Sequence, residues 1–175
     1  MTLNDLGPRI CIMGPSNSGK STLATAVGRA RGLTPIHLDL LYHRPGTDWV
    51  PRPYDEFKTL HDEAILGTSW AMDGNYSRLL PQRLVRATGV ILLDTSTANS
   101  LLRYFRRSWF ERNRLGSLEG GKDSVKWEMI RHIVVTTREN RRRYKEMFDG
   151  ISLPKVRLAT SSELARFYRS ERLVR

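Results

Sequence analysis

The sequence predicts an α/β fold of three layers, in which a parallel five-stranded sheet lies between helices. Short apolar runs alternate with longer amphipathic segments along the 175 residues, as is typical of strands joined by crossover helices. A glycine-rich turn joins the first apolar run to the first helical segment, and three of the apolar runs end in an aspartate. The length suits one domain, because it can bury a core yet is too short for two ordinary domains.

The five expected strands share a short apolar run bounded by turn or loop residues. They cover residues 10–13, 35–39, 70–73, 90–94 and 154–158. We interpret three of them as ending in a carboxylate, namely Asp39, Asp73 and Asp94. Open parallel sheets bind ligands at the carboxyl ends of their strands, so these side chains are expected at the ligand-binding edge.

Helical periodicity fills the intervals between the strands. A helix is expected to begin near Tyr54, after Pro53, and to end at Gly67, and a shorter helix has Pro81 near its start. The remaining expected helices cover residues 21–27, 97–109, 124–148 and 161–168, with a polar, glycine-rich excursion at 115–123.

The glycine-rich turn is a complete phosphate-binding loop, Gly14, Pro15, Ser16, Asn17, Ser18, Gly19, Lys20, Ser21. Glycines let the backbone curl so that successive N–H groups point at phosphate oxygens, and the following helix adds its positive end. Lys20 supplies a charge for the outer phosphates, while the hydroxyl of Ser21 is a hard ligand suited to Mg²⁺. Together with Thr22, these residues are the expected site for ATP and Mg²⁺; ATP is preferred because no guanine-reading motif is present.

Positive charge is concentrated in one segment. The net charge is +11, and residues 103–145 contain thirteen Lys or Arg against five acids. Such a segment suits a solvated helical face, a nucleic-acid surface or arginines that close over phosphates. The phosphate loop favours the last of these.

Composition argues against a membrane or metal-cluster role. No apolar run approaches the roughly 20 residues that span a bilayer, and no signal-peptide pattern is present, so a cytoplasmic location is expected. The single cysteine, Cys11, is expected to be a buried hydrophobe. The four histidines form no metal-ligand grouping, and His37 is interpreted as a packing residue.

The order of these motifs resembles that of adenylate-kinase-related P-loop proteins, and most of all the group labelled topology-modulation proteins. That group shares the His-Leu-Asp of residues 37–39, the Pro-Gly-aromatic loop of 45–49 and the Asp-Gly-Asn-Tyr of 73–76. The resemblance covers about residues 9–168. It implies a P-loop NTPase fold of the nucleoside-monophosphate-kinase type in one domain, residues 1–175. Residues 40–69 would form an acceptor-side loop and helix insert, and residues 103–145 a small, helical, arginine-rich lid.

The resemblance also implies roles at the phosphate end of the site. Asp73 is expected to hold the magnesium shell with Ser21, because in such kinases the third strand lies beside the phosphate-loop strand. Asp94 is the competing candidate, with a helix cap as its simpler interpretation. Arg103 and Arg107, one helical turn apart, are expected to contact the base and the transferred phosphate. Further lid arginines are expected among Arg138, Arg141 and Arg142.

On the acceptor side, Asp39 is expected to orient or deprotonate an acceptor hydroxyl, with a turn-stabilising role as the alternative. The other expected acceptor contacts are Trp49, Gly74, Asn75, Tyr76 and Arg78, with Tyr42 as a further aromatic candidate. Nucleoside monophosphate kinases carry Asp-Gly-Phe-Pro-Arg where residues 73–77 read Asp-Gly-Asn-Tyr-Ser. This difference removes their arginine for the acceptor phosphate unless Arg78 substitutes, which argues against AMP.

The expected function is therefore a Mg²⁺-dependent transfer of the γ-phosphoryl group of ATP to a small-molecule or nucleotide acceptor. A nucleic-acid-associated regulatory NTPase is the less favoured alternative, and a nucleotide-binding module without efficient catalysis is a third. The sequence leaves the acceptor and the oligomeric state open.

Overall fold

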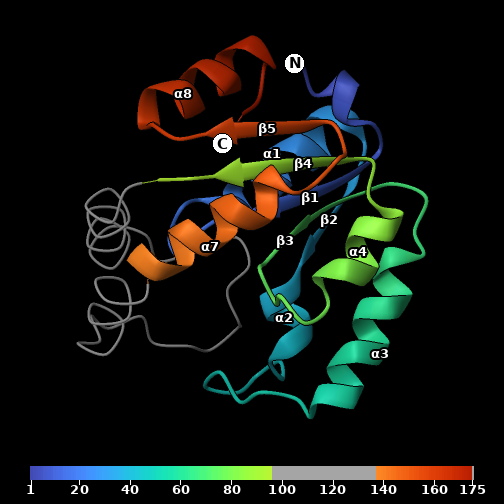
Figure 1. Cartoon of the computed structure of the whole chain (residues 1–175). Helices are drawn as coiled ribbons and strands as arrows, with labels where there is room; N and C mark the ends of the chain where they lie inside the picture. Colours follow the sequence, from blue (N-terminus) through green and yellow to red (C-terminus); the bar gives the residue numbers. More distant parts are fainter. Residues whose placement is uncertain (96–136, 175) are drawn as a thin grey trace.

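The computed structural model describes residues 1–95 and 137–174, with helices on both faces of one sheet (Figure 1). All four strand pairings are parallel, in the order β2-β3-β1-β4-β5. The strands are β1 (Arg9–Met13), β2 (Thr34–His37), β3 (Trp70–Asp73), β4 (Gly89–Leu93) and β5 (Lys155–Leu158). The helices are η1 (Asn4–Leu6), α1 (Lys20–Arg31), α2 (Leu38–Tyr42), α3 (Tyr54–Ile65), α4 (Leu80–Arg86), α7 (Thr137–Asp149) and α8 (Ser161–Ser170).

The strands divide the core into two apolar layers because successive side chains point to opposite faces. In β1, Ile10 and Ile12 pack with α1 and α8, whereas Cys11 and Met13 pack with α3, α4 and α7. The expected three-layer α/β fold is thereby confirmed. Residues 137–148 of the helix expected at 124–148 lie in α7. The expected helix at 97–109, the excursion at 115–123 and residues 124–136 lie outside the described residues. In the described ranges, no helix is long and apolar enough to cross a membrane.

The strand order places the phosphate-loop strand at the centre of the sheet. β1 lies between β3 and β4, with Ile12 opposite Asp73 on one side and Met13 opposite Leu92 on the other. The segments that follow these three strands therefore meet at one carboxyl edge. This edge is where open α/β sheets bind ligands.

The interpretation of residues 35–39 as a strand ending in a carboxylate is wrong at its carboxyl end. β2 ends at His37, and Asp39 lies in the first turn of α2, where its carbonyl accepts a hydrogen bond from the N–H of His43 at 3.1 Å. The turn buries Leu38 against Gly74, where an added Cβ would lie 2.8 Å from Leu38 Cβ. The backbone therefore turns into α2 at Leu38, which buries this side chain, and β2 does not continue to Asp39.

Cys11 is buried in β1, as expected, and burial raises the pKa of its thiol from 9.0 to about 11.

Because the thiolate is the reactive form of a cysteine, we expect no labelling of Cys11 in native protein by Ellman's reagent at pH 8 and complete labelling in denaturant. The folded pKa lies above the unfolded one, so this group favours folding below pH 9 and does so progressively less between pH 9 and 11. Rapid labelling of the native protein would contradict this placement.

Candidate nucleotide and acceptor site

Residues 14–19 form a curled loop between β1 and α1. Gly14 has φ +147°, and an added Cβ would lie 2.4 Å from the carbonyl oxygen of Leu93, so only glycine fits there. Gly19 caps α1 in a left-handed conformation with φ +95°. The N–H of Ser18 donates to the carbonyl of Pro15 at 3.3 Å. The loop thus leads directly into a helix amino terminus, the arrangement that binds phosphate.

Lys20, Ser21 and Thr22 occupy the first turn of α1, and all three are half-buried. The ammonium of Lys20 donates to the carbonyl of Pro15 at 2.8 Å, so the side chain folds back over the loop. The ammonium group that is expected to bind phosphate therefore lies beside the backbone of the loop.

Asp73 ends β3 next to the phosphate-loop strand and is buried. Its Oδ1 lies 3.0 Å from Nδ1 of His37, whose Nε2 lies 3.4 Å from Oγ1 of Thr25 on α1. His37, interpreted from the sequence as a packing residue, therefore also orients the carboxylate of Asp73.

The donor set at this edge fits Mg²⁺. The hydroxyl of Ser21 and the carboxylate of Asp73 are hard oxygen ligands, and Mg²⁺ usually takes few protein ligands besides water and substrate phosphates. Across the described ranges, no group of three or more His, Cys, Asp or Glu side chains could form a complete metal cage. A sparse oxygen set of this kind suits a magnesium ion delivered with a nucleotide.

Asp94, the competing candidate, follows β4 and is held by two arginines. Arg141 Nε donates to its Oδ1 at 2.8 Å, and Arg157 Nη2 donates to its Oδ2 at 2.6 Å. Both carboxylate oxygens thus take part in ion pairs that tie α7 to β5. This favours Asp73 over Asp94 as the magnesium carboxylate.

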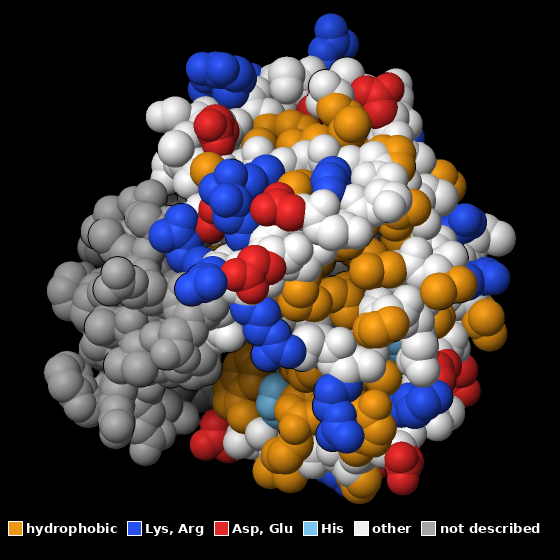
Figure 2. All heavy atoms as spheres, in the orientation of Figure 1, with side chains coloured by type: hydrophobic (Ala, Val, Ile, Leu, Met, Phe, Trp, Pro, Cys, Tyr) orange, Lys and Arg blue, Asp and Glu red, His pale blue; other side chains and the backbone are white. Residues whose placement is uncertain are grey.

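The arginines expected in the lid are only partly within the described structure. Arg103 and Arg107 lie outside the described residues, as does the side chain of Arg138. Arg141 contacts Asp94, and Arg142 pairs with Glu146 at 2.8 Å on the exposed side of α7. Figure 2 shows Lys and Arg side chains gathered over α7.

Residues 74–76, which we call the acceptor turn, connect the phosphate loop to Asp39. Both polar groups of the Asn75 side-chain amide bond to Gly14, and the phenol of Tyr76 donates to Asp39 Oδ1 at 2.6 Å. Burial, reinforced by the charge of Asp39, raises the pKa of the Tyr76 phenol. The phenol therefore stays protonated and donates to the carboxylate.

An aromatic cluster of Tyr42, Phe57 and Tyr76 lies beside Asp39, with ring centroids 4.9–5.1 Å apart. Trp49 joins this cluster through His43, whose ring centroid lies 5.0 Å from that of Trp49 and 4.7 Å from that of Tyr42. Asp39 and Tyr76 are thus in direct contact, whereas Trp49 is linked to them only through the rings of His43 and Tyr42.

Arg78, expected as an acceptor contact, lies over the ring of Tyr54. Its guanidinium lies 4.7 Å from the ring centroid of Tyr54, at the start of α3. A cation–aromatic contact of this kind holds the side chain at the surface.

Arg83 is the main residue at this edge that the sequence reasoning missed. Its side chain is fully buried in α4, and it donates to the carbonyls of Gly74 at 2.8 Å, Asn75 at 2.6 Å and Tyr76 at 3.2 Å. Burial lowers the pKa of Arg83, and the carboxylate of Asp73 opposes that shift. A signal was present, because Arg83 interrupts the apolar stripe formed by Leu80 and Leu84 of α4 and by Ala87, which caps the helix.

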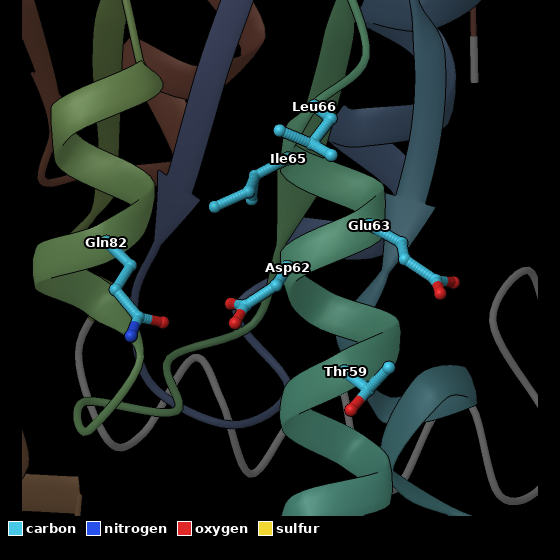
Figure 3. A pocket seen from close by; sticks show the side chains of 6 residues that line it. All are labelled: Thr59, Asp62, Glu63, Ile65, Leu66 and Gln82. Carbon is cyan, nitrogen blue, oxygen red and sulfur yellow. The ribbon is translucent and has the colours of Figure 1, made fainter.

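A shallow hollow of about 490 Å³ lies apart from this edge, between α3 and α4 (Figure 3). Its lining residues are Thr59, Asp62, Glu63, Ile65, Leu66 and Gln82. Figure 3 shows Asp62 and Gln82 facing one another from the two helices. The hollow lies along the carboxyl-terminal half of α3, which ends at Ile65. It contains none of the expected site residues.

The strand order and the loop define a P-loop fold of the nucleoside-monophosphate-kinase-like class. Among solved structures, the chain is similar to a gluconokinase from Sinorhizobium meliloti 1021, with a TM-score of 0.54 and 16% identity over 95% of this chain and 90% of that one. It is also similar to a shikimate kinase from Acinetobacter baumannii in complex with shikimate, with a TM-score of 0.50 and 15% identity over 95% of this chain and 92% of that one. No family model and no curated protein matches the sequence. The likeness to kinases is therefore one of fold.

Proposed function

We propose that this protein is a Mg²⁺-dependent phosphotransferase that moves the γ-phosphoryl group of ATP to a hydroxyl of a small acceptor. The main support is the geometry of one sheet edge, where the phosphate loop with Lys20, the buried carboxylate of Asp73 and the Asp39–Tyr76 pair follow adjoining elements. The fold is shared with kinases of small molecules. The sequence resemblance to the topology-modulation group agrees with this proposal.

In this proposal, the residues act by positioning and by neutralising charge. The loop amides and Lys20 bind the outer phosphates, and Lys20 exchanges its bond with the carbonyl of Pro15 for phosphate oxygens. Ser21 and Asp73 would hold Mg²⁺, which when bound neutralises phosphate charge. Asp39 accepts the proton of the acceptor hydroxyl as the new P–O bond forms and the bond to the ADP oxygen breaks. Tyr76 orients Asp39 through its hydrogen bond.

The test is a screen of nucleosides, nucleotides, sugars and small acids for stimulated ADP release from Mg-ATP. We expect at least one class of acceptor to raise the rate, and the increase to vanish in the Lys20→Ala variant. Binding of Mg-ATP with no stimulation by any acceptor would instead support a nucleotide-binding module.

Replacing the proposed base separates the two roles of Asp39. We expect Asp39→Asn to lower kcat by about a hundredfold or more with little change in the KM for ATP, because a positioned base typically contributes about a hundredfold to ten-thousandfold. Asp39 is exposed, so the substitution should leave the fold intact. Thr59→Ala, an exposed substitution on α3, is the matched control. An unchanged kcat in Asp39→Asn would assign Asp39 to stabilisation of the turn.

The regulatory NTPase remains a second candidate because of the net charge of +11 and the exposed Arg142, Arg143 and Lys145 on α7. It predicts tight binding of DNA or RNA whose affinity falls steeply as salt increases. No binding at physiological salt would favour the phosphotransferase.

A further inference from the structure

The side chain of Asn75 pairs with both backbone groups of Gly14, the first glycine of the phosphate loop. The N–H of Gly14 donates to Asn75 Oδ1 at 3.2 Å, and Asn75 Nδ2 donates to the carbonyl of Gly14 at 2.8 Å. A backbone N–H can only donate and a carbonyl can only accept, so this pair fixes the orientation of the amide. The contact continues the pairing of β1 with β3 beyond its last registered pair, Ile12 and Asp73.

Asn75 is itself held by another element, because Arg83 of α4 donates to its backbone carbonyl at 2.6 Å. The amide that holds Gly14 therefore has a defined position before any ligand arrives.

We propose that Asn75 is a positioning residue that holds Gly14 in its phosphate-binding conformation, which extends the proposed function to a residue that need not touch a substrate. Gly14 has φ +147°, and an added Cβ would lie 2.4 Å from the carbonyl oxygen of Leu93, so its backbone has a conformation that is suited to glycine and must be held in place. Holding this residue in advance removes an ordering cost from nucleotide binding. Asn75 was expected from the sequence to contact the acceptor, whereas its amide is occupied by the phosphate loop.

The first test measures the Kd of Mg-ATP by calorimetry, without any acceptor. Asn75→Ala removes both hydrogen bonds, so we expect the Kd to rise about tenfold or more, because the loop must then be ordered when the nucleotide binds. Asn75→Asp should weaken binding further, because its second oxygen faces the carbonyl of Gly14 and adds negative charge near the phosphates. Ser77→Ala is the matched control directly after the acceptor turn, because the Ser77 hydroxyl accepts a hydrogen bond from Arg143.

The second test measures hydrogen exchange of the Gly14 amide by NMR in nucleotide-free protein, with the Cys11 amide in β1 as internal reference. Asn75→Ala should speed exchange at Gly14 and leave Cys11 unchanged, and Ser77→Ala should change neither.

Binding of Mg-ATP by Asn75→Ala as tight as in the parent would overturn the proposal and leave the proposed function standing. If the parent binds no Mg-ATP, the proposed function fails. In that case, faster exchange at Gly14 still supports the hold by Asn75, and unchanged exchange overturns it.

Discussion

Replacing Lys20 with alanine is expected to lower ATP turnover by about a thousandfold or more, because a preorganised charge or donor aimed at the transferring group contributes at this scale. Lys20 lies in the first turn of α1 and donates to the carbonyl of Pro15 in the loop that would enclose the phosphates. Alanine suits this helical position, so the free energy of unfolding should change by less than about 1 kcal/mol. The measurement is the rate of ADP release together with a thermal unfolding curve.

Lys58→Ala is the matched control for this prediction. Lys58 lies on α3, where its ion pair with Asp62 is partly exposed, and it belongs to no part of the proposed site. Solvent-exposed i,i+4 pairs contribute little to stability, so this variant should keep both activity and fold. A Lys20→Ala protein that retains the full rate would remove the basis of the proposed mechanism.

The phosphate loop and the sheet could be predicted because their determinants are local. Gly14 and Gly19 adopt the positive φ values for which glycine is suited, and the expected strand at 70–73 corresponds to β3. The expectation that β3 lies beside the phosphate-loop strand came from the family resemblance, and the strand order confirms it.

The contacts of the acceptor turn could not be predicted because they join residues far apart in the chain. Asn75 meets Gly14 across 61 positions, and Tyr76 meets Asp39 across 37. Asp39 itself was misplaced, since packing of Leu38 against Gly74 depends on the pairing of β2 with β3. A single sequence does not show which distant residues meet. The residue types of the site were therefore recognised, but their hydrogen-bond and packing partners were not.

Arg83→Met is expected to destabilise the protein by about 3–5 kcal/mol, because three carbonyls lose a buried charged donor and each buried group left unsatisfied costs about 1–3 kcal/mol. Methionine fills a similar volume but donates no hydrogen bond, which leaves the carbonyls of Gly74, Asn75 and Tyr76 without the guanidinium. For a chain of this length, the loss corresponds to a fall in Tm of about 10 °C or more.

Arg86→Ala on the same helix provides the comparison for Arg83→Met, because the Arg86 side chain is exposed and only its backbone carbonyl contacts Arg9. Its Tm should stay within about 2 °C of the parent value, as for most surface substitutions. Because Arg83 also fixes Asn75, the Kd of Mg-ATP should rise in Arg83→Met at temperatures where the variant is still folded. A Tm equal to that of Arg86→Ala would mean that water replaces the guanidinium at no cost, and that the acceptor turn keeps its shape without Arg83.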